Sequence, residues 1–323
     1  MTILEADRLR KHFNGLAAVD EVSFAIDEGS IFGFLGPNGA GKTTTINMLT
    51  GLARPTAGKI FYQGRDCTQR LKDAQHLMGV VPDESNLYPE LNGFENLCFC
   101  AALYGLGKAE RESRSRSLLE TFGLADAAGR KFAGYSKGMK RKLTIAAAVI
   151  HHPTILFLDE PTSGIDVASA RQIRQLLADL KRDGTTIFLT THYIEEAERL
   201  CDRIAFIVNG RIVANDEVAR LLKPVQGRFA TVFSVQGSGP SLIDKLRSAF
   251  PDLDFTPESQ NQLRVESTGP IAIGPLVRSF EENGIEVAEA RRVQPSLEDV
   301  FVRITGIEAL VMKKEVEKRG GAA

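Results

Sequence analysis

Short apolar runs alternate with longer segments of helical periodicity over residues 1–222. Residues 31–35 and 155–158 are continuous apolar runs of strand length, and residues 186–190 have an apolar centre. Such runs are typical of strands buried on both faces of a sheet. Between the last two runs, residues 167–180 show the spacing of an amphipathic helix, with apolar positions at Ile173, Leu176, Leu177 and Leu180. Strand, helix and strand in this order predict a parallel sheet.

The pattern then changes twice. Residues 203–208 and 211–214 flank Asn209 and Gly210, a pair that suits the tight primed turn of a β-hairpin. The segment Lys-Pro-Val-Gln-Gly at residues 223–227 predicts a domain boundary. We therefore expect one domain over residues 1–222, a second over 228–306, and a tail at 307–323.

The second domain has its own order of predicted elements. We expect strands near residues 229–235, 253–255, 262–266 and 285–290, helices near 241–250 and 273–283, and a short helix at 296–304. The order β-α-β-β-α-β is the ferredoxin-like arrangement. We therefore expect a small α+β domain after the boundary.

Composition narrows the classes of partner. The 323 residues carry a formal net charge of −1, which argues against nucleic acid as the main partner because such affinity comes from a basic face. Four cysteines are too few and too scattered for a disulfide framework. No run approaches the roughly 20 apolar residues of a membrane span. We therefore expect no direct membrane insertion, so any link to a membrane comes through a partner.

A glycine-rich loop follows the first apolar run. Residues 36–43 read Gly-Pro-Asn-Gly-Ala-Gly-Lys-Thr and match the phosphate-binding pattern G-x-x-x-x-G-K-[ST]. The glycines let backbone N–H groups converge on phosphate, and the following helix favours negative charge at its start. Lys42 can reach the β- and γ-phosphates, and the Thr43 hydroxyl can face Mg²⁺. The predicted ATP-binding residues of this loop are Gly36, Pro37, Asn38, Gly39, Ala40, Gly41, Lys42, Thr43 and Thr44.

Two carboxylates follow the strand at residues 155–158. Buried carboxylates are costly without partners or a role. Asp159 suits Mg²⁺, held through water, and Glu160 can polarise an attacking water. The alternative is a turn or capping pair before Pro161. The phosphate loop upstream makes this alternative the weaker interpretation.

With further motifs in order, residues 1–222 resemble the ATP-binding domain of ABC transporters. Residues 36–43 resemble Walker A, and residues 155–160, Ile-Leu-Phe-Leu-Asp-Glu, resemble Walker B with its catalytic glutamate. Residues 135–140, Tyr-Ser-Lys-Gly-Met-Lys, resemble the ABC signature; 163–166 resemble the D-loop, and 190–192 the H-loop. The resemblance implies a P-loop ABC ATPase fold with a mixed sheet, a parallel core and a helical subdomain, hydrolysing ATP with Mg²⁺.

The resemblance also implies a dimer. ATP would lie between Walker A of one subunit and the signature of a second copy or of a homologous subunit. Ser136 and Gly138 would contact the γ-phosphate across this interface, and His192 would hold the γ-phosphate or the attacking water. The residues implied to act in trans are Ser136, Lys137, Gly138, Met139 and Asp166. The alternative for His192 is a histidine that caps a helix.

Three positions depart from the family pattern or have a strong alternative. Phe13 stands where the family places an aromatic under adenine, but it could be a core phenylalanine beside Val22 and Phe24. The Q-loop glutamine is replaced by Asp83, which we take as a metal-shell residue. In the signature, Lys137 and Met139 replace glycine and glutamine.

The resemblance implies a partner and a class. The signature and residues 295–301 are similar to those of ABC-2-type exporters of drugs, antibiotics or polysaccharides. The chain would then act on the cytoplasmic face of the membrane with separate permease subunits. Residues 84–99 would receive a permease helix, with Leu87, Tyr88, Phe94 and Leu97 as candidate contacts. The alternative for these four residues is the core of a helical subdomain.

Two other functions stay open at this stage. A soluble ABC ATPase acting on ribosomes or DNA would usually carry two ATPase heads or a long coiled-coil insert, and this chain has neither. A regulatory module with weak or no hydrolysis is disfavoured by Glu160 and His192. The second domain would regulate or help to dimerise the ATPase heads.

Overall fold

The computed structural model describes residues 1–323 except 224, 226, 237–239, 260, 294–295 and 308–323. The chain forms two compact units: the first contains Met1–Val218 and the described residues from Ile304 on, and the second contains Ala219–Arg303. Among the described residues, no helix combines the length and the apolar character that a membrane span requires.

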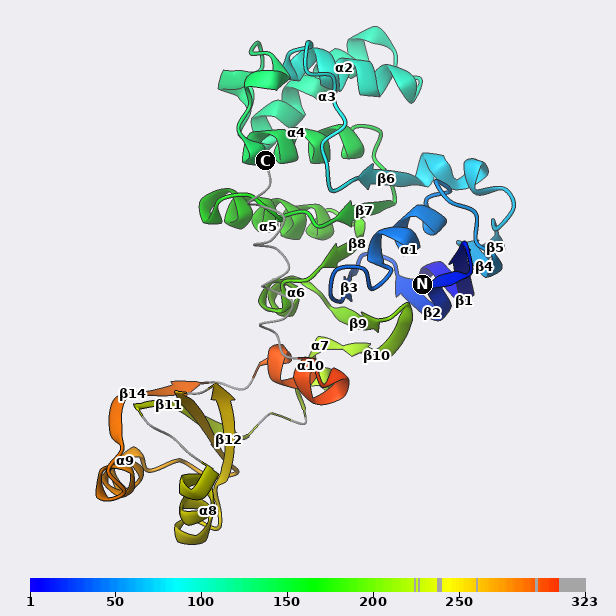
Figure 1. Ribbon diagram of the computed structural model, residues 1–323. Helices are drawn as coiled ribbons and strands as arrows, with labels where there is room; N and C mark the ends of the chain where they lie inside the picture. The colour runs from blue at the N-terminus through cyan, green and yellow to red at the C-terminus, as the bar shows by residue number, and fades with distance from the viewer. Residues whose placement is uncertain (224, 226, 237–239, 260, 294–295, 308–323) are drawn as a thin grey trace. The chain divides into compact units, whose positions relative to one another are not determined.

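The first unit is built on a six-stranded sheet with a parallel core (Figure 1). Its strand order is β10-β9-β3-β8-β7-β6. The strands are β3 (Ile31–Leu35), β6 (Met78–Val81), β7 (Ile155–Asp159), β8 (Thr186–Thr191), β9 (Arg203–Val208) and β10 (Arg211–Glu217). All neighbours are parallel except β9 and β10, the predicted hairpin, whose turn residues Asn209 and Gly210 both have positive φ. The predicted mixed sheet with a parallel core is therefore confirmed.

A second, antiparallel sheet covers part of this core. It contains β1 (Thr2–Phe13), β2 (Leu16–Asp27), β4 (Ala57–Tyr62) and β5 (Arg65–Asp66), in the order β2-β1-β4-β5. Five phenylalanines interleave between the two sheets, and the Phe188 ring lies 5.6–5.8 Å from the other four. The other four are Phe24, Phe32, Phe34 and Phe157. Phe188 is therefore the centre of the hydrophobic core.

Helices complete the first unit. They are α1 (Lys42–Leu49), α2 (Gly93–Leu103), α3 (Lys108–Thr121), α4 (Lys137–Val149), α5 (Val167–Arg182) and α6 (Ile194–Leu200). Figure 1 shows α2 and α3 grouped beyond the β6 edge of the sheet, where both pack against α4. The Asn92 side chain accepts from Glu95 N–H and the Glu95 side chain accepts from Asn92 N–H, a capping box that starts α2. These helices are the expected helical subdomain.

The second unit has one antiparallel sheet in the order β12-β13-β11-β14. Its elements are α7 (Val218–Leu222) from Ala219 on, β11 (Phe229–Gln236), α8 (Pro240–Ala249), β12 (Asp254–Ser259), β13 (Gln262–Ser267), α9 (Ile273–Glu282), β14 (Glu286–Val293) and α10 (Leu297–Thr305) as far as Arg303. Phe233 of β11 packs against Phe280 of α9 with ring centroids 5.2 Å apart. Arg264 of β13 holds α10 through Asp299, with Nη2 and Oδ1 2.8 Å apart.

Replacing Phe188 with alanine should lower the free energy of unfolding of the first unit by about 3–5 kcal/mol. The reason is the cavity left among four aromatic rings, which cannot collapse without moving both sheets. Chemical denaturation measures the change. The control is Leu52→Ala, which is 70% exposed and should change stability by less than about 0.5 kcal/mol. Equal effects of the two substitutions would contradict this account of the core.

Candidate functional site

The glycine-rich loop wraps around the ammonium group of Lys42. The Lys42 side chain is buried, and its Nζ donates to the carbonyl oxygens of Gly36 at 2.8 Å and Pro37 at 3.2 Å. A Cβ at Gly36 would lie 2.1 Å from the Ile207 carbonyl oxygen, so glycine is required there for close approach to β9. Gly41 has a φ of +104°, which L-residues with side chains rarely adopt. The shape of the loop is therefore constrained by its glycines and by its contact with β9.

Glu160 joins this lysine to His192. It follows β7, and its Oε1 lies 3.1 Å from Lys42 Nζ while its Oε2 lies 2.9 Å from His192 Nδ1. Burial would raise the pKa of Glu160, but the hydrogen bond from His192 and the charge of Lys42 outweigh it and hold the pKa below its usual value. The carboxylate is therefore ionised at neutral pH.

The backbone at Glu160 fixes this geometry. Its φ is +48°, in the left-handed region, and its N–H donates to the Thr190 carbonyl at 3.2 Å and to Thr190 Oγ1 at 3.1 Å. The Thr190 hydroxyl in turn donates to Oδ1 of buried Asp159. One threonine on β8 thus positions both carboxylates that end β7.

His192 has one ring nitrogen in use and one free. Its Nδ1 faces Glu160, while its buried Nε2 has no hydrogen-bond partner among the described residues. Buried polar atoms without a partner are uncommon in proteins, and such an atom next to a phosphate loop is suited to an incoming ligand. His192 does not cap a helix here, since α6 starts after Tyr193 without a side-chain cap.

The residues expected to act across a dimer occupy two helix starts. Ser136 caps α4 and accepts from the Met139 N–H at 3.2 Å. Asp166 caps α5 and accepts from the Ser169 N–H at 2.8 Å, which holds the pKa of Asp166 below its usual value. In the described part of the chain, neither cap hydrogen-bonds to Lys42. Within one chain, these residues are therefore not joined to the Lys42–Glu160–His192 cluster.

Solvent exposure distinguishes surface from core positions at Phe13, Tyr88 and Leu97. Phe13 is 50% exposed at the end of β1, with Lys11 Nζ 4.9 Å from its ring centroid, so the alternative of a core phenylalanine is wrong. Leu97 is fully buried and belongs to the subdomain core, whereas Tyr88 is exposed and packs edge-to-face on exposed Phe99. Leu97 is therefore not available as a permease contact.

Asp83 lies at the Q-loop position beside an arginine. Its side chain is 60% exposed, and its Oδ1 lies 3.6 Å from Nη2 of Arg141. Partial burial raises the pKa of Asp83; the charge of Arg141 lowers it, and Asp159 and Glu160 raise it further. Among the described residues, Arg141 is therefore the cation that pairs with Asp83.

Comparison with known proteins now identifies the family. Residues 19–163 match the ABC transporter family. The chain is 34% identical over 307 residues to the linearmycin resistance ATP-binding protein LnrL of Bacillus subtilis (strain 168), covering 94% of this chain and 98% of that protein. The chain belongs to the ATP-binding subunits of ABC transporters. Like them, it is an ATPase of the P-loop class.

Two further comparisons agree with this assignment. The ABC ATPase is 38% identical over 289 residues to a fluoroquinolones export ATP-binding protein of Mycobacterium tuberculosis (strain CDC 1551 / Oshkosh), covering 90% of this chain and 88% of that one. A solved dimeric ATP-binding cassette, in a post-hydrolysis state bound to ADP and Pi, aligns with a TM-score of 0.61 and 26% identity. That alignment covers 67% of this chain and 99% of the solved one.

Sequence reasoning missed two buried charges of the ABC ATPase. Arg141 of α4 donates to the carbonyl of Pro82 at 2.6 Å and to that of Asp83, and so anchors the Q-loop segment. Its burial is indicated by the sequence, because Arg141 stands three residues after Gly138 and four before Ile145, the spacing of one face of a helix. A buried arginine needs polar partners, so this position predicts a contact with a neighbouring segment.

The second missed charge is Glu196 of α6. Its Oε2 accepts from the Thr162 hydroxyl at 2.5 Å, and its Oε1 lies 3.3 Å from Nη1 of Arg174. Burial raises the pKa of Glu196 despite these partners. It ties the segment after Glu160 to α5 and α6, a contact that no local pattern reveals.

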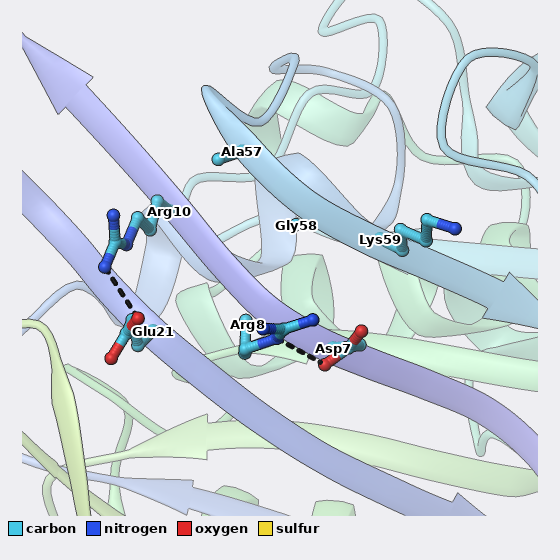
Figure 2. Close-up of a pocket in the computed structure, with 7 residues that line it drawn as sticks. All are labelled: Asp7, Arg8, Arg10, Glu21, Ala57, Gly58 and Lys59. Carbon is cyan, nitrogen blue, oxygen red and sulfur yellow. Dashed lines mark hydrogen bonds and ion pairs between the residues drawn. The ribbon is translucent and has the colours of Figure 1, made fainter.

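A surface pocket lies apart from this cluster, on β1, β2 and β4 (Figure 2). Figure 2 shows two ion pairs in it, Arg8 with Asp7 at 3.2 Å and Arg10 with Glu21 at 2.6 Å. Its third cation, Lys59, lies 3.8 Å from Asp66 outside the pocket. No predicted site residue lines it. The pocket is therefore not the nucleotide site of the ABC ATPase.

The stability difference between wild type and Glu160→Gln should increase with pH. Because the pKa of Glu160 is lowered in the folded state, its charged form contributes stability above the unfolded value near 4.5, and this is lost as pH falls through the folded value. Denaturation of both proteins at pH 3 and pH 7 measures it. In a His192→Ala background the increase should shrink. A difference that falls as pH rises would contradict the geometry of the cluster.

Proposed function

We propose that the chain hydrolyses Mg-ATP at the Lys42–Glu160–His192 cluster and drives export through separate permease subunits. The observation that carries the chemistry is the buried contact between Lys42 Nζ and Glu160 Oε1, at 3.1 Å. Phosphate oxygens can replace Glu160 as the partner of Lys42, since both are anionic acceptors. Glu160 is then free to orient a water for attack on the γ-phosphorus. His192 can donate from Nε2 to the same phosphate as an imidazolium, because in the neutral ring the one N–H is the Nδ1–H that faces Glu160.

Mg²⁺ would enter with the nucleotide. The described residues contain no group of three or more His, Cys, Asp or Glu side chains able to hold a metal alone. Mg²⁺ in phosphoryl-transfer sites keeps several waters and uses one or two protein oxygens together with substrate phosphates. Exposed Thr43 and buried Asp159 fit that limited role. Asp83 is a further candidate, and its carboxylate would have to leave Arg141 to take part.

Phe13 is proposed as the adenine platform. Its half-exposed ring stands at the end of β1 and offers a face for stacking. Lys11 also reaches this ring, and its Nζ is fixed by a 2.7 Å hydrogen bond to the Arg54 carbonyl. The face turned away from the lysine can accept a purine base.

Two copies would complete two sites. Ser136 and Asp166 are placed at helix starts, where N–H groups favour phosphate. They are not joined to Lys42 within the chain, so they are available to a neighbouring copy. A twofold-symmetric pair would use the same face twice, which makes two equivalent sites. The dimeric cassette bound to ADP and Pi supports this arrangement.

The export role rests on the relatives and on one exposed surface. The two relatives described above are named for drug resistance and for export. The exposed pair Tyr88 and Phe99, together with half-buried Leu87 and Phe94, offers an apolar surface on the helical subdomain. We propose that a permease helix of an ABC-2-type exporter docks there from the membrane.

The second unit is proposed to regulate or to help pair the ATPase units.

Replacing Phe13 with alanine should weaken ATP binding by about 1–3 kcal/mol, the range found for base stacking on an aromatic ring. Phe13→Tyr should bind like wild type. Titration calorimetry with ATP and with inorganic tripolyphosphate separates base from phosphate recognition. The alanine variant should lose affinity for ATP alone. An equal loss for both ligands would contradict the stacking role.

Replacing Glu160 with glutamine should lower kcat by about 100-fold or more, as expected when a general base is lost. Because binding is retained, ATP should trap the variant as a dimer, visible by light scattering after size exclusion. Glu160→Gln combined with Lys42→Ala should stay monomeric with ATP. Rapid turnover by Glu160→Gln, or no ATP-dependent dimer even with the permease present, would contradict the proposal.

A further inference from the structure

Gly138 is a glycine for lack of space beside α5. A Cβ built at this position would lie 2.3 Å from Ser169 Oγ and 2.6 Å from Ser169 Cβ. Its backbone is helical within α4 and its φ is not positive, so no conformational reason requires glycine there. The requirement is steric, because real Cβ contacts under 3.0 Å essentially never occur.

The same contact joins the two helix starts that carry the proposed trans residues. Ser169 is in the first turn of α5, and its N–H donates to Oδ1 of the cap Asp166 at 2.8 Å. Two residues before Gly138, Ser136 caps α4. The Cβ position of Gly138 is also only 3.8 Å from Asp166 Oδ2. The signature and the first turn of α5, which follows the D-loop, thus approach each other closely where Gly138 faces Ser169.

We propose that Ser169 is a positioning residue. Its close packing on Gly138 fixes the position of the D-loop cap Asp166 relative to the signature residue Ser136 within one protomer. This inference rests on the proposed dimeric ATPase. With Ser169 in place, a side chain at 138 must push α4 and α5 apart by nearly 1 Å to reach ordinary contact distance. Ser136 and Asp166 would then no longer match a nucleotide held by the second copy, and a misplacement of about 1 Å can cost about 10²-fold in rate.

If the close contact is what matters, only one of positions 138 and 169 needs to be glycine, and it can be either one. In Gly138→Ala, the new methyl group meets Ser169. In Gly138→Ala combined with Ser169→Gly, both the hydroxyl and the Cβ that it meets are gone. The Ser169 N–H that the Asp166 cap accepts is a backbone group and is kept in every variant.

Full-length protein with its permease tests this by ATPase kinetics. Gly138→Ala should lose about 10- to 100-fold in kcat. Adding Ser169→Gly should restore kcat to within about threefold of the Ser169→Gly single variant. Adding Ser169→Ala is the matched control, and it should restore little because the 2.6 Å contact with Cβ remains. If both double variants stay as slow as Gly138→Ala, Gly138 is needed for the nucleotide itself and the proposal is overturned.

Thermal melting and ATP-dependent dimerisation exclude misfolding and a wrong proposed function as causes of slow turnover. Thermal melting shows whether Gly138→Ala is folded; if it is not, Ser169→Val takes its place, because a β-branched side chain crowds Gly138 from the other helix. Ser169→Val should then slow turnover, and wild-type kcat in that variant would overturn the proposal. ATP-dependent dimerisation of Glu160→Gln, in which Gly138 is intact, tests the proposed function separately from the role of Ser169. If pairing fails there, the proposed function is at fault, whereas pairing without rescue refutes only the role of Ser169.

Discussion

A buried lysine and a buried glutamate at 3.1 Å are the interaction on which the site depends. Lys42 and Glu160 are 6% and 9% exposed, and isolated charges at such burial would be strongly unfavourable. Each is satisfied by more than its partner. Carbonyls of the glycine-rich loop accept from Lys42, and His192 lies beside Glu160. Residues of the site itself thus neutralise and hydrogen-bond both charges.

Sheet topology brings these residues together although they are far apart in sequence. β3, β8 and β7 are adjacent and parallel, so their carboxyl ends meet at one edge of the sheet. The phosphate loop follows β3, Glu160 follows β7 and His192 follows β8. The Phe188 cluster fixes the strands below this edge, and Thr190 fixes both carboxylates above it. A change in the aromatic core would therefore act on the site through the spacing of these strands.

Local patterns predicted the strands, the loop and the hairpin, because each depends on neighbours in sequence. The phosphate loop could be read from eight consecutive residues, and the continuous apolar runs were the buried strands. Burial at single positions was harder. Phe13 could not be separated from a core residue by sequence, and Leu97 was counted among surface candidates although it is fully buried. In both cases the deciding fact is which other element covers the side chain.

Contacts between distant elements could not be predicted at all. Arg141 with Asp83, Glu196 with Thr162, and Gly138 with Ser169 each join segments that no periodicity relates. The Gly138 case is instructive, since the glycine is visible in the sequence while the reason for it lies in α5.

The central claim is that Lys42 of one copy and Ser136 of another serve the same nucleotide. Mixing Lys42→Ala with Ser136→Arg, each inactive alone, tests it most directly. Random exchange makes about half of the dimers mixed, and each mixed dimer has one site with both residues intact. The account predicts that ATPase activity of the equimolar mixture rises well above the mean of the separate proteins. A mixture no more active than that mean, with subunit exchange verified, would contradict it.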